Sequence, residues 1–344
     1  MKKTLEQYWA AIESGKINPV FQCEEKNHGL IFDPAGDDTP LLHMAFGRWY
    51  LLDNESETTE TGEREFVMVP IGGTGRVDVE GEPPVDLSRP GGPFKTLPES
   101  SNARALYVGR RRRFTVRGRT KMLFFSAPAF SDRPVRLVGA GEKSLKSRGQ
   151  LLWRRDVIEL VAPGETSDNL IVGETYSPPG MWSGTPLHVH DRRDDLLSES
   201  DYEEVYYFVQ RHFTRQDEMD PYAVQMMFDA RGLNRAFRLK HRTAVAIPGG
   251  CHPVVAGPCS DLLYVWGLAS DRPQDRFMMR DIRDSAFLKR IGLAVTSLME
   301  KRGDVPVPRE LFSQLCADFG LNTEKETTIL RIYLREYGFK VLPD

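Results

Sequence analysis

The sequence lacks any apolar run near the roughly 20 residues that a membrane-spanning helix requires. It also lacks a strong charge of either sign, because 46 lysines and arginines face 49 aspartates and glutamates, a formal net charge of -3. This balance argues against a nucleic-acid partner and gives no support to a membrane-surface role. Two lysines open the chain as in a signal peptide, but Glu6, Gln7 and Glu13 interrupt the apolar stretch, which predicts mature protein.

Cysteine is scarce, and none of the residues forms a CxxC pair. Four cysteines occur, Cys23, Cys251, Cys259 and Cys316. This usage predicts a reduced, cytoplasmic protein, although pairing of Cys251 with Cys259 stays open. Cys251 itself is interpreted as a small buried residue.

Most of the chain has the sequence pattern that is typical of β-strands joined by turns. Residues 3–14 predict a short amphipathic helix, which Thr4 can cap and Gly15 can end. From about residue 28 to residue 275, short apolar runs alternate with Gly, Pro, Asn and Asp clusters. FVMVPIGG, EVYYFV and LLYVWGLAS are examples. Short strands separated by turn residues in this way predict an all-β barrel or sandwich.

The strand-forming sequence falls into two sets, which predicts two barrels of similar architecture. The segment GAGEKSLKSRGQLLWRR between them is predicted to be a linker that packs on both halves. After residue 275 the pattern turns helical, and two short helices are expected, one over 309–319 and one after Thr323. They pack on a barrel or form a partner surface. Four parts are therefore expected: a helix and lead-in (1–27), an N-terminal barrel (28–140), a C-terminal barrel (141–275) and a helical extension (276–344).

The run GRRRRFTVRGRTKM (109–122) is unusually basic. Phe114 and Val116 alternate with arginines, which predicts a strand with one solvated basic face. The alternative is a patch that binds an anion or a partner.

The segment PLHVHDRRDDLLSESDYEEVYYFV is the most informative in the chain. His188 and His190 are two residues apart, so a strand would place both imidazoles on one face. Glu203 and Glu204 open the next strand, and alternation allows only one of them to face the barrel lumen.

A third histidine follows the next turn signal, where Pro-Gly-Gly leads to His252. Three imidazoles and one carboxylate leave room for further ligands on a divalent ion, as in catalytic metal sites. The remaining histidines, His28, His43, His212 and His241, are interpreted as structural or surface residues.

Several of these segments together resemble the 5-deoxy-glucuronate isomerase family of myo-inositol catabolism, a bicupin family. The resemblance covers roughly residues 28–275 and is carried by residues 60–81, 123–129, 134–142, 154–191, 203–208 and 248–258. It implies a double cupin fold whose N-terminal barrel is metal-free. It also implies one divalent metal ion, Zn or Mn with Fe or Ni as alternatives, held by His188, His190, Glu204 and His252.

The resemblance implies a ketol-isomerase that acts on a sugar acid, with 5-deoxy-glucuronate as the expected substrate. Such a reaction moves a proton between adjacent carbons through an enediolate, whose negative charge a metal ion would stabilise. The substrate carboxylate would require an arginine, for which Arg192 or Arg193 is expected and Arg235 is a second choice. Tyr206 or Tyr264 would orient the substrate or transfer a proton.

Two other classes of function remain open. Three histidines and one glutamate also suit an iron oxygenase, and a non-catalytic sugar-binding or regulatory cupin would use the helical extension as an interaction module. Metal identity and activity without oxygen separate the first alternative from an isomerase. A homo-oligomer is left open.

Overall fold

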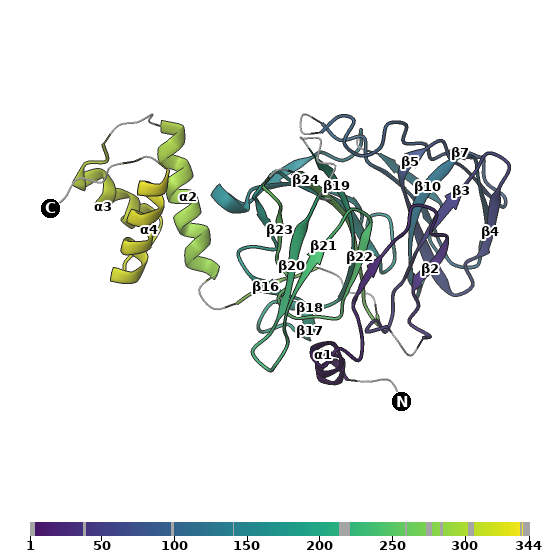
Figure 1. The fold of residues 1–344 in the computed structure, drawn as a ribbon, viewed down its shortest axis with the longest axis horizontal. Coiled ribbons are helices and arrows are strands. Elements are labelled where there is room, and N and C mark those ends of the chain that lie inside the picture. The colour runs from purple at the N-terminus through teal and green to yellow at the C-terminus, as the bar shows by residue number, and fades with distance from the viewer. Residues whose placement is uncertain are drawn as a thin grey trace.

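The computed structural model shows a chain of antiparallel β-sheets with helices near both ends (Figure 1). It describes residues 4–36, 39–97, 100–139, 141–212, 221–258, 260–272, 277–282, 285–301, 306–337 and 339.

Two large sheets form the centre of the molecule. The seven-stranded sheet has the order β1 (Val20–Gln22), β22 (Thr243–Ile247), β19 (Glu203–His212), β24 (Ser260–Ala269), β14 (Ile171–Ser177), β13 (Arg155–Val161) and β12 (Lys146–Arg148). The six-stranded sheet has the order β11 (Arg136–Gly139), β8 (Arg104–Val108), β5 (Arg64–Gly73), β10 (Thr120–Pro128), β3 (Ala45–Leu51) and β2 (Gly29–Phe32).

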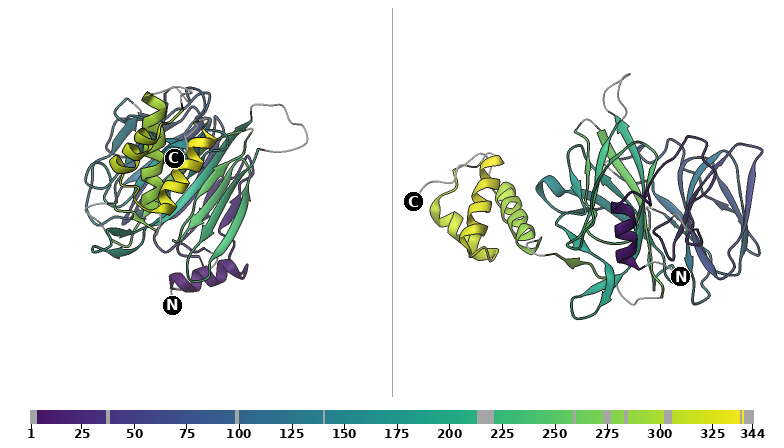
Figure 2. Two further views of the ribbon diagram at one scale, coloured as in Figure 1. Left: turned by 90° about the vertical axis from the view of Figure 1, so that its left-hand side faces the viewer. Right: turned by 60° about the horizontal axis from the view of Figure 1, so that its bottom comes forward.

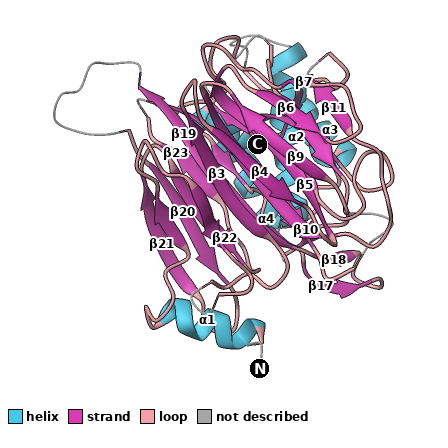
Figure 3. Cartoon of the chain, turned by 90° about the vertical axis from the view of Figure 1, so that its right-hand side faces the viewer, coloured by secondary structure: helices cyan, strands magenta, loops and turns pink. Residues whose placement is uncertain are grey.

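Each large sheet is closed into a barrel by a smaller outer sheet. The second-barrel outer sheet contains β15 (Trp182–Ser183), β23 (Val254–Ala256), β20 (Ala223–Phe228) and β21 (Asn234–Leu239). The first-barrel outer sheet, which faces the viewer in Figure 3, contains β4 (Ser56–Glu60), β9 (Arg113–Arg117), β6 (Arg76–Val79) and β7 (Val85–Asp86). Two short ladders pair β16 (His188–Val189) with β25 (Arg280–Asp281) and β17 (Asp191–Asp194) with β18 (Glu199–Asp201).

Period-two alternation builds a separate apolar core on each side of each large sheet. On β19, Val205 and Tyr207 pack between the two large sheets, while Tyr206 and Phe208 face the interior of the second barrel. This is the division of the strand that the sequence predicts, and it places two barrels side by side through their large sheets (Figures 1 and 3).

The N-terminal segment is part of the second barrel. Helix α1 (Leu5–Glu13) is capped by Thr4 as predicted, and its buried Tyr8, Trp9 and Ile12 join the second-barrel core. Strand β1 then pairs with β22 at the edge of the seven-stranded sheet. The lead-in thus crosses the second barrel before the chain builds the first one.

The predicted linker also contains regular structure. Its residues form β12, which pairs with β13, and η1 (Leu151–Trp153), a short 3-10 helix. Leu145 packs on the core between the barrels, and Leu151 packs on the C-terminal helices. The prediction of a connecting segment was therefore incomplete, because backbone pairing makes it an edge strand.

The C-terminal region holds one helix more than the sequence predicts. Helices α3 (Arg309–Asp318) and α4 (Glu324–Glu336) agree with the two expected helices, and α2 (Ser285–Lys301) precedes them. Their apolar faces form a small core of their own at the end of the molecule away from the first barrel (Figures 1 and 2). No helix in the described part of the chain is long and apolar enough to span a membrane.

The basic run lies on the first-barrel outer sheet. Phe114 and Val116 of β9 are buried while Arg113 and Arg117 are exposed, so the predicted alternation is confirmed. Arg113 lies near Glu60 and Arg117 near Asp78. The basic side chains therefore already have carboxylate partners on neighbouring strands, as a solvated strand face does.

Candidate metal centre

Three separate segments bring the predicted ligands together inside the second barrel. His188 belongs to β16, His190 follows it, and Glu204 is the second residue of β19. His252 follows a turn in which Gly250 has a positive φ of 78°, a conformation that favours glycine. The Asp191 carboxylate accepts a hydrogen bond from the Gly250 amide at 2.7 Å, which joins the His190 segment to the His252 turn.

Each of the three imidazoles is oriented by a main-chain carbonyl. The Nδ1 atoms of His188, His190 and His252 lie 3.3, 3.0 and 2.7 Å from the carbonyl oxygens of Pro186, Tyr202 and Gly250, respectively. A carbonyl oxygen only accepts, so each Nδ1 carries the proton. Each Nε2 is thereby the ring nitrogen that can face a metal ion, an arrangement by which proteins orient histidines for metal ligation.

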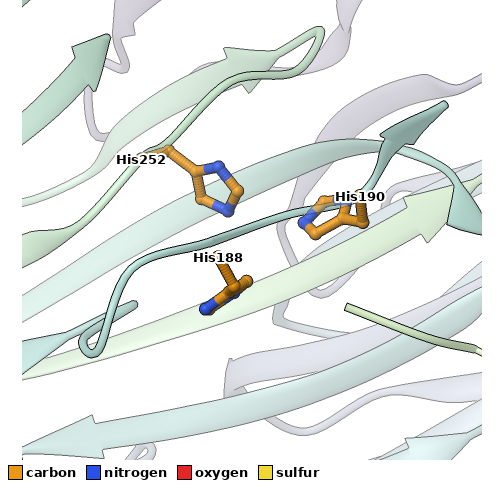
Figure 4. Close-up of side chains that lie close together, drawn as sticks. All are labelled: His188, His190 and His252. Atoms are coloured by element: carbon orange, nitrogen blue, oxygen red, sulfur yellow. The ribbon is translucent and has the colours of Figure 1, made fainter. Parts of the chain in front are cut away.

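The Nε2 atoms of His190 and His252 lie close to the carboxylate of Glu204. Glu204 Oε2 lies 3.4 Å from His190 Nε2 and 3.1 Å from His252 Nε2. The candidate ligand atoms of the three histidines all lie within 4.8 Å of one another, and their rings surround one common space (Figure 4). The structure therefore brings together all four residues predicted as metal ligands.

The electrostatics of the cluster match a ligand set. Burial, with the neighbouring His252 and His190, lowers the pKa of His188 to about 3, so this imidazole stays neutral. Burial alone would raise the pKa of Glu204, but its bonds with His190 and His252 outweigh burial and lower it to about 2. Burial likewise opposes a charge on His190, yet its bond with Glu204 leaves the pKa raised. Three imidazoles beside an ionised carboxylate are a donor set that fits a divalent first-row metal with open coordination positions.

Glu203, the neighbouring carboxylate, lies on the opposite face of β19. It accepts hydrogen bonds from the main-chain amides of Leu42 and His43, each at 2.7 Å, and of Met44. Glu203 therefore anchors the segment that leads into β3, and Glu204 alone faces the lumen.

A cavity of about 700 Å³ opens beside the cluster. Its wall includes three of the four predicted ligands, together with aromatic residues and charged residues of both signs. Tyr206 and Tyr264 are buried in this wall with ring centroids 4.6 Å apart, and the Tyr264 hydroxyl hydrogen-bonds Ser183. Burial raises the pKa of both tyrosines, so each keeps its hydroxyl proton at neutral pH.

Two arginines line the cavity, Arg148 and Arg155, and the sequence analysis predicts neither as a site residue. Arg155 lies on β13, at the end of the segment predicted as a linker. The predicted Arg192 does not line the cavity: its side chain is 49% exposed, with Nε 3.8 Å from a carboxylate oxygen of Glu199. Arg235 donates to the Glu13 carbonyl on the outer side of the barrel, and Arg193 is exposed. Proximity in sequence to the HxH pair was a misleading signal, because β17 turns away from the lumen.

The other histidines and cysteines are not among the residues grouped as candidate ligands in the described part of the chain. His28 contacts the Tyr50 carbonyl and Glu57, and His241 accepts a hydrogen bond from the Gln210 amide. The side chain of His212 lies outside the described part. Cys23, Cys251 and Cys316 are free and buried, whereas Cys259 lies outside the described residues, so its pairing with Cys251 stays open.

Two antiparallel barrels packed through their large sheets, with a histidine-rich cluster in the lumen of one of them, define a double cupin. The sequence profile of the KduI/IolB family matches residues 20–283, and the chain belongs to this family.

Relatives with assigned activities are similar to this chain in sequence. The chain is 28% identical over 233 residues to the 5-deoxy-glucuronate isomerase of Shouchella clausii (strain KSM-K16), covering 65% of this chain and 80% of the relative. It is 26% identical over 244 residues to that of Bacillus subtilis (strain 168), with coverages of 68% and 84%. Family and relatives identify an enzyme of the isomerase class.

Solved structures support the fold. An IolB-like protein from Salmonella typhimurium LT2 superposes with a TM-score of 0.69 at 24% identity, covering 79% of this chain and 99% of the other. Bacillus subtilis oxalate decarboxylase, a protein with Mn(II) centres, gives a TM-score of 0.53 at 12% identity, with coverages of 91% and 86%. The helical extension after residue 283 lies outside the family match.

Proposed function

We propose that the protein is a metal-dependent aldose–ketose isomerase that converts 5-deoxy-glucuronate to 2-deoxy-5-keto-gluconate in the cytoplasmic breakdown of inositol. The observation that carries this proposal is the clustering of three imidazoles, two of them in contact with the Glu204 carboxylate, beside a cavity of about 700 Å³. The assigned activity of the relatives in Shouchella and Bacillus supports the choice of substrate.

His188, His190, His252 and Glu204 would hold the metal ion, with Zn or Mn as the expected metal. When bound, a divalent ion supplies Lewis-acid stabilisation of the negative charge that develops on the sugar oxygens. The main-chain bonds to the three Nδ1 atoms keep the imidazoles aimed at this position, so little reorganisation accompanies binding.

The tyrosines of the cavity wall would orient the sugar. Because burial keeps their hydroxyl protons in place, Tyr206 and Tyr264 are hydrogen-bond donors at neutral pH. Tyr206 follows Glu204 by two residues on the same face of β19, and its hydroxyl hydrogen-bonds the Glu204 carboxylate beside the cavity. We assign it to hold a sugar oxygen and to supply a proton to it. Trp266 and Phe277 exclude water from the same space.

The test combines metal analysis with an assay that excludes oxygen. Purified protein is analysed for metal by mass spectrometry, and conversion of 5-deoxy-glucuronate is followed by NMR under anaerobic conditions. Chelation should abolish conversion, and added Zn²⁺ or Mn²⁺ should restore it. Conversion that requires oxygen would instead identify an oxygenase, and metal binding without turnover of this or related uronates would identify a binding protein.

The His190→Ala variant should lose metal and activity together. Removal of one ligand is expected to weaken metal affinity by at least about 100-fold. His28→Ala is the matched control, because His28 pairs with Glu57 in the first barrel, away from the ligands. Full activity of a metal-free His190→Ala protein would refute the mechanism.

A further inference from the structure

Strand β13 presents alternate side chains to the cavity and to the core between the barrels. Arg155, Val157 and Glu159 line the cavity, while Ile158 and Leu160 pack between the two large sheets. Arg155 therefore projects into the cavity because of the same period-two alternation that turns Tyr206 toward it.

The main chain holds the Arg155 guanidinium by one nitrogen. Nη1 donates to the carbonyl oxygen of Trp153 at 3.2 Å and to that of Thr185 at 3.1 Å. Trp153 lies in η1, and Thr185 lies just before the strand that carries His188. Because both bonds use Nη1, the Nε and Nη2 groups stay available for a planar, two-oxygen acceptor.

Arg155 lacks the carboxylate partner that a structural arginine of this protein has. Arg89 is fully buried and forms a two-pronged pair with Glu174, with Nη2 to Oε2 at 2.9 Å. Among the described residues, no carboxylate oxygen lies within 4.0 Å of an Arg155 nitrogen. A half-buried guanidinium without a counter-charge is costly unless an anion arrives.

The two tyrosines line the same cavity as this cation and the ligand cluster. The hydroxyls of Tyr206 and Tyr264 both sense the charge of Arg155 and that of Glu204. Burial is the main cause that lowers the pKa of Arg155, and the nearby Arg148 adds to it, so a bound anion would relieve an existing electrostatic cost. One cavity is thus lined by a cation, two tyrosines and three of the metal ligands.

We propose that Arg155 binds the carboxylate of the sugar acid and thereby makes the cavity selective for uronate-type anions over neutral sugars. This proposal rests on the proposed function for the identity of the reacting end of the sugar. Binding of the carboxylate to the Arg155 fork would direct the opposite end of the chain toward His188, His190 and Glu204. Lys146 and Arg148 of the exposed edge strand β12 supply further positive charge beside Arg155.

A pair of sugars that differ at one group tests this proposal. D-glucuronate carries a carboxylate where D-glucose carries a hydroxymethyl group, so their affinities for the Mn²⁺-loaded protein, measured by ligand-observed NMR titration, report on carboxylate recognition. Wild type should bind glucuronate about 10- to 100-fold more tightly than glucose, the range expected for hydrogen bonds to a charged group. Arg155→Gln should remove this preference and leave metal content unchanged.

Two further variants separate recognition from folding. Arg155→Lys keeps the charge but loses the planar fork, so it should retain part of the preference for glucuronate. If Arg155→Gln fails to fold, the proposal is tested with Arg155→Lys instead. Arg238→Gln removes an exposed arginine of β21 in the same barrel and should behave as wild type. A wild-type protein without the preference, or an Arg155 variant that keeps it in full, would overturn the proposal.

The outcome is distinguishable from failure of the proposed function. Conversion of 5-deoxy-glucuronate is measured in parallel on the wild type. If glucuronate binding depends on Arg155 but 5-deoxy-glucuronate is not converted, the isomerase proposal is contradicted and the carboxylate subsite is supported. If the protein converts 5-deoxy-glucuronate and Arg155→Gln leaves KM unchanged, only the proposal of the carboxylate subsite is contradicted.

Discussion

At the scale of single residues, two adjacent carboxylates have opposite roles because a strand turns consecutive side chains to opposite faces. Glu204 faces two imidazoles in the lumen, whereas Glu203 accepts main-chain hydrogen bonds from the segment before β3. The first arrangement concerns metal binding, and the second concerns the attachment of the first barrel to the second.

Exchanging each carboxylate for an amide should separate these two roles. Glu204→Gln keeps the shape but removes the ligand charge, so metal affinity should fall by about 10- to 100-fold or more with little change in unfolding temperature. Glu203→Gln weakens charge-assisted bonds to buried amides and should lower the free energy of unfolding by about 1–3 kcal/mol with metal content unchanged. Metal analysis and thermal unfolding of both variants provide the check, and each serves as the control for the other. Loss of metal from Glu203→Gln alone would contradict the assignment.

The four residues predicted as ligands lie together in the structure, whereas none of the arginines predicted to bind the carboxylate lines the cavity. The two-residue spacing of His188 and His190 requires only that the segment is extended, which is a local property. Arg155 reaches the same cavity from a strand two positions away in the seven-stranded sheet from β24, and nothing near Arg155 in sequence marks it as part of the site. Arg192, although adjacent to the HxH pair, lies beside acidic side chains on another ladder.

At the scale of elements, the contact between the two large sheets depends on glycine at one position. Gly267 of β24 faces β10 of the first barrel, and a Cβ atom there would overlap the ring of Phe125. Glycine weakens a strand in isolation, so its presence in the middle of β24 is explained by the close approach of the two sheets.

Adding one methyl group at this contact should destabilise the protein. Gly267→Ala would force Phe125 or the sheets to move, at a cost of about 1–3 kcal/mol in the free energy of unfolding. Gly139→Ala on β11 is the matched control, because an added Cβ atom there has no neighbour within 4 Å. Chemical denaturation of both variants measures the difference, and equal stability would show that the sheets are not closely packed at Gly267.

The edges of the seven-stranded sheet illustrate what a local pattern misses. All three residues of β12 are exposed, so no apolar alternation marks this strand in the sequence. β1 is equally short and pairs with β22, more than 200 residues later in the chain. Pairing with a distant partner, not local propensity, makes both segments strands.

At the scale of the whole molecule, the helical extension is attached to both sides of the candidate site. The Ser285 hydroxyl donates to the Leu187 carbonyl at 2.8 Å, next to His188. Tyr333 of α4 packs edge-on against Trp153, with ring centroids 5.9 Å apart, and a Cβ atom at Gly292 of α2 would lie 2.9 Å from the same indole. The Trp153 carbonyl in turn holds Arg155, so the extension supports the proposed carboxylate subsite.

Loosening this contact should therefore weaken substrate binding at a distance. Tyr333→Ala should raise KM for the uronate by about 3- to 10-fold, a magnitude typical of residues that act through a neighbour, with kcat and metal content little changed. Ser313→Ala, an exposed substitution on α3, is the control. Steady-state kinetics and metal analysis check the prediction. An unchanged KM in a folded Tyr333→Ala protein would show that the extension does not position Arg155.

The sequence by itself determined what depends on neighbouring residues: the β texture, the cap of α1, the helices α3 and α4, and the histidine spacing. These follow from side-chain alternation, capping and helical periodicity, which act over a few residues. Only the tertiary structure decided that β1 and β12 complete the seven-stranded sheet, that α2 packs its Gly292 on Trp153, and that Arg155 enters the cavity. Each of these depends on which distant strands pair and in which register, and no local pattern encodes that choice.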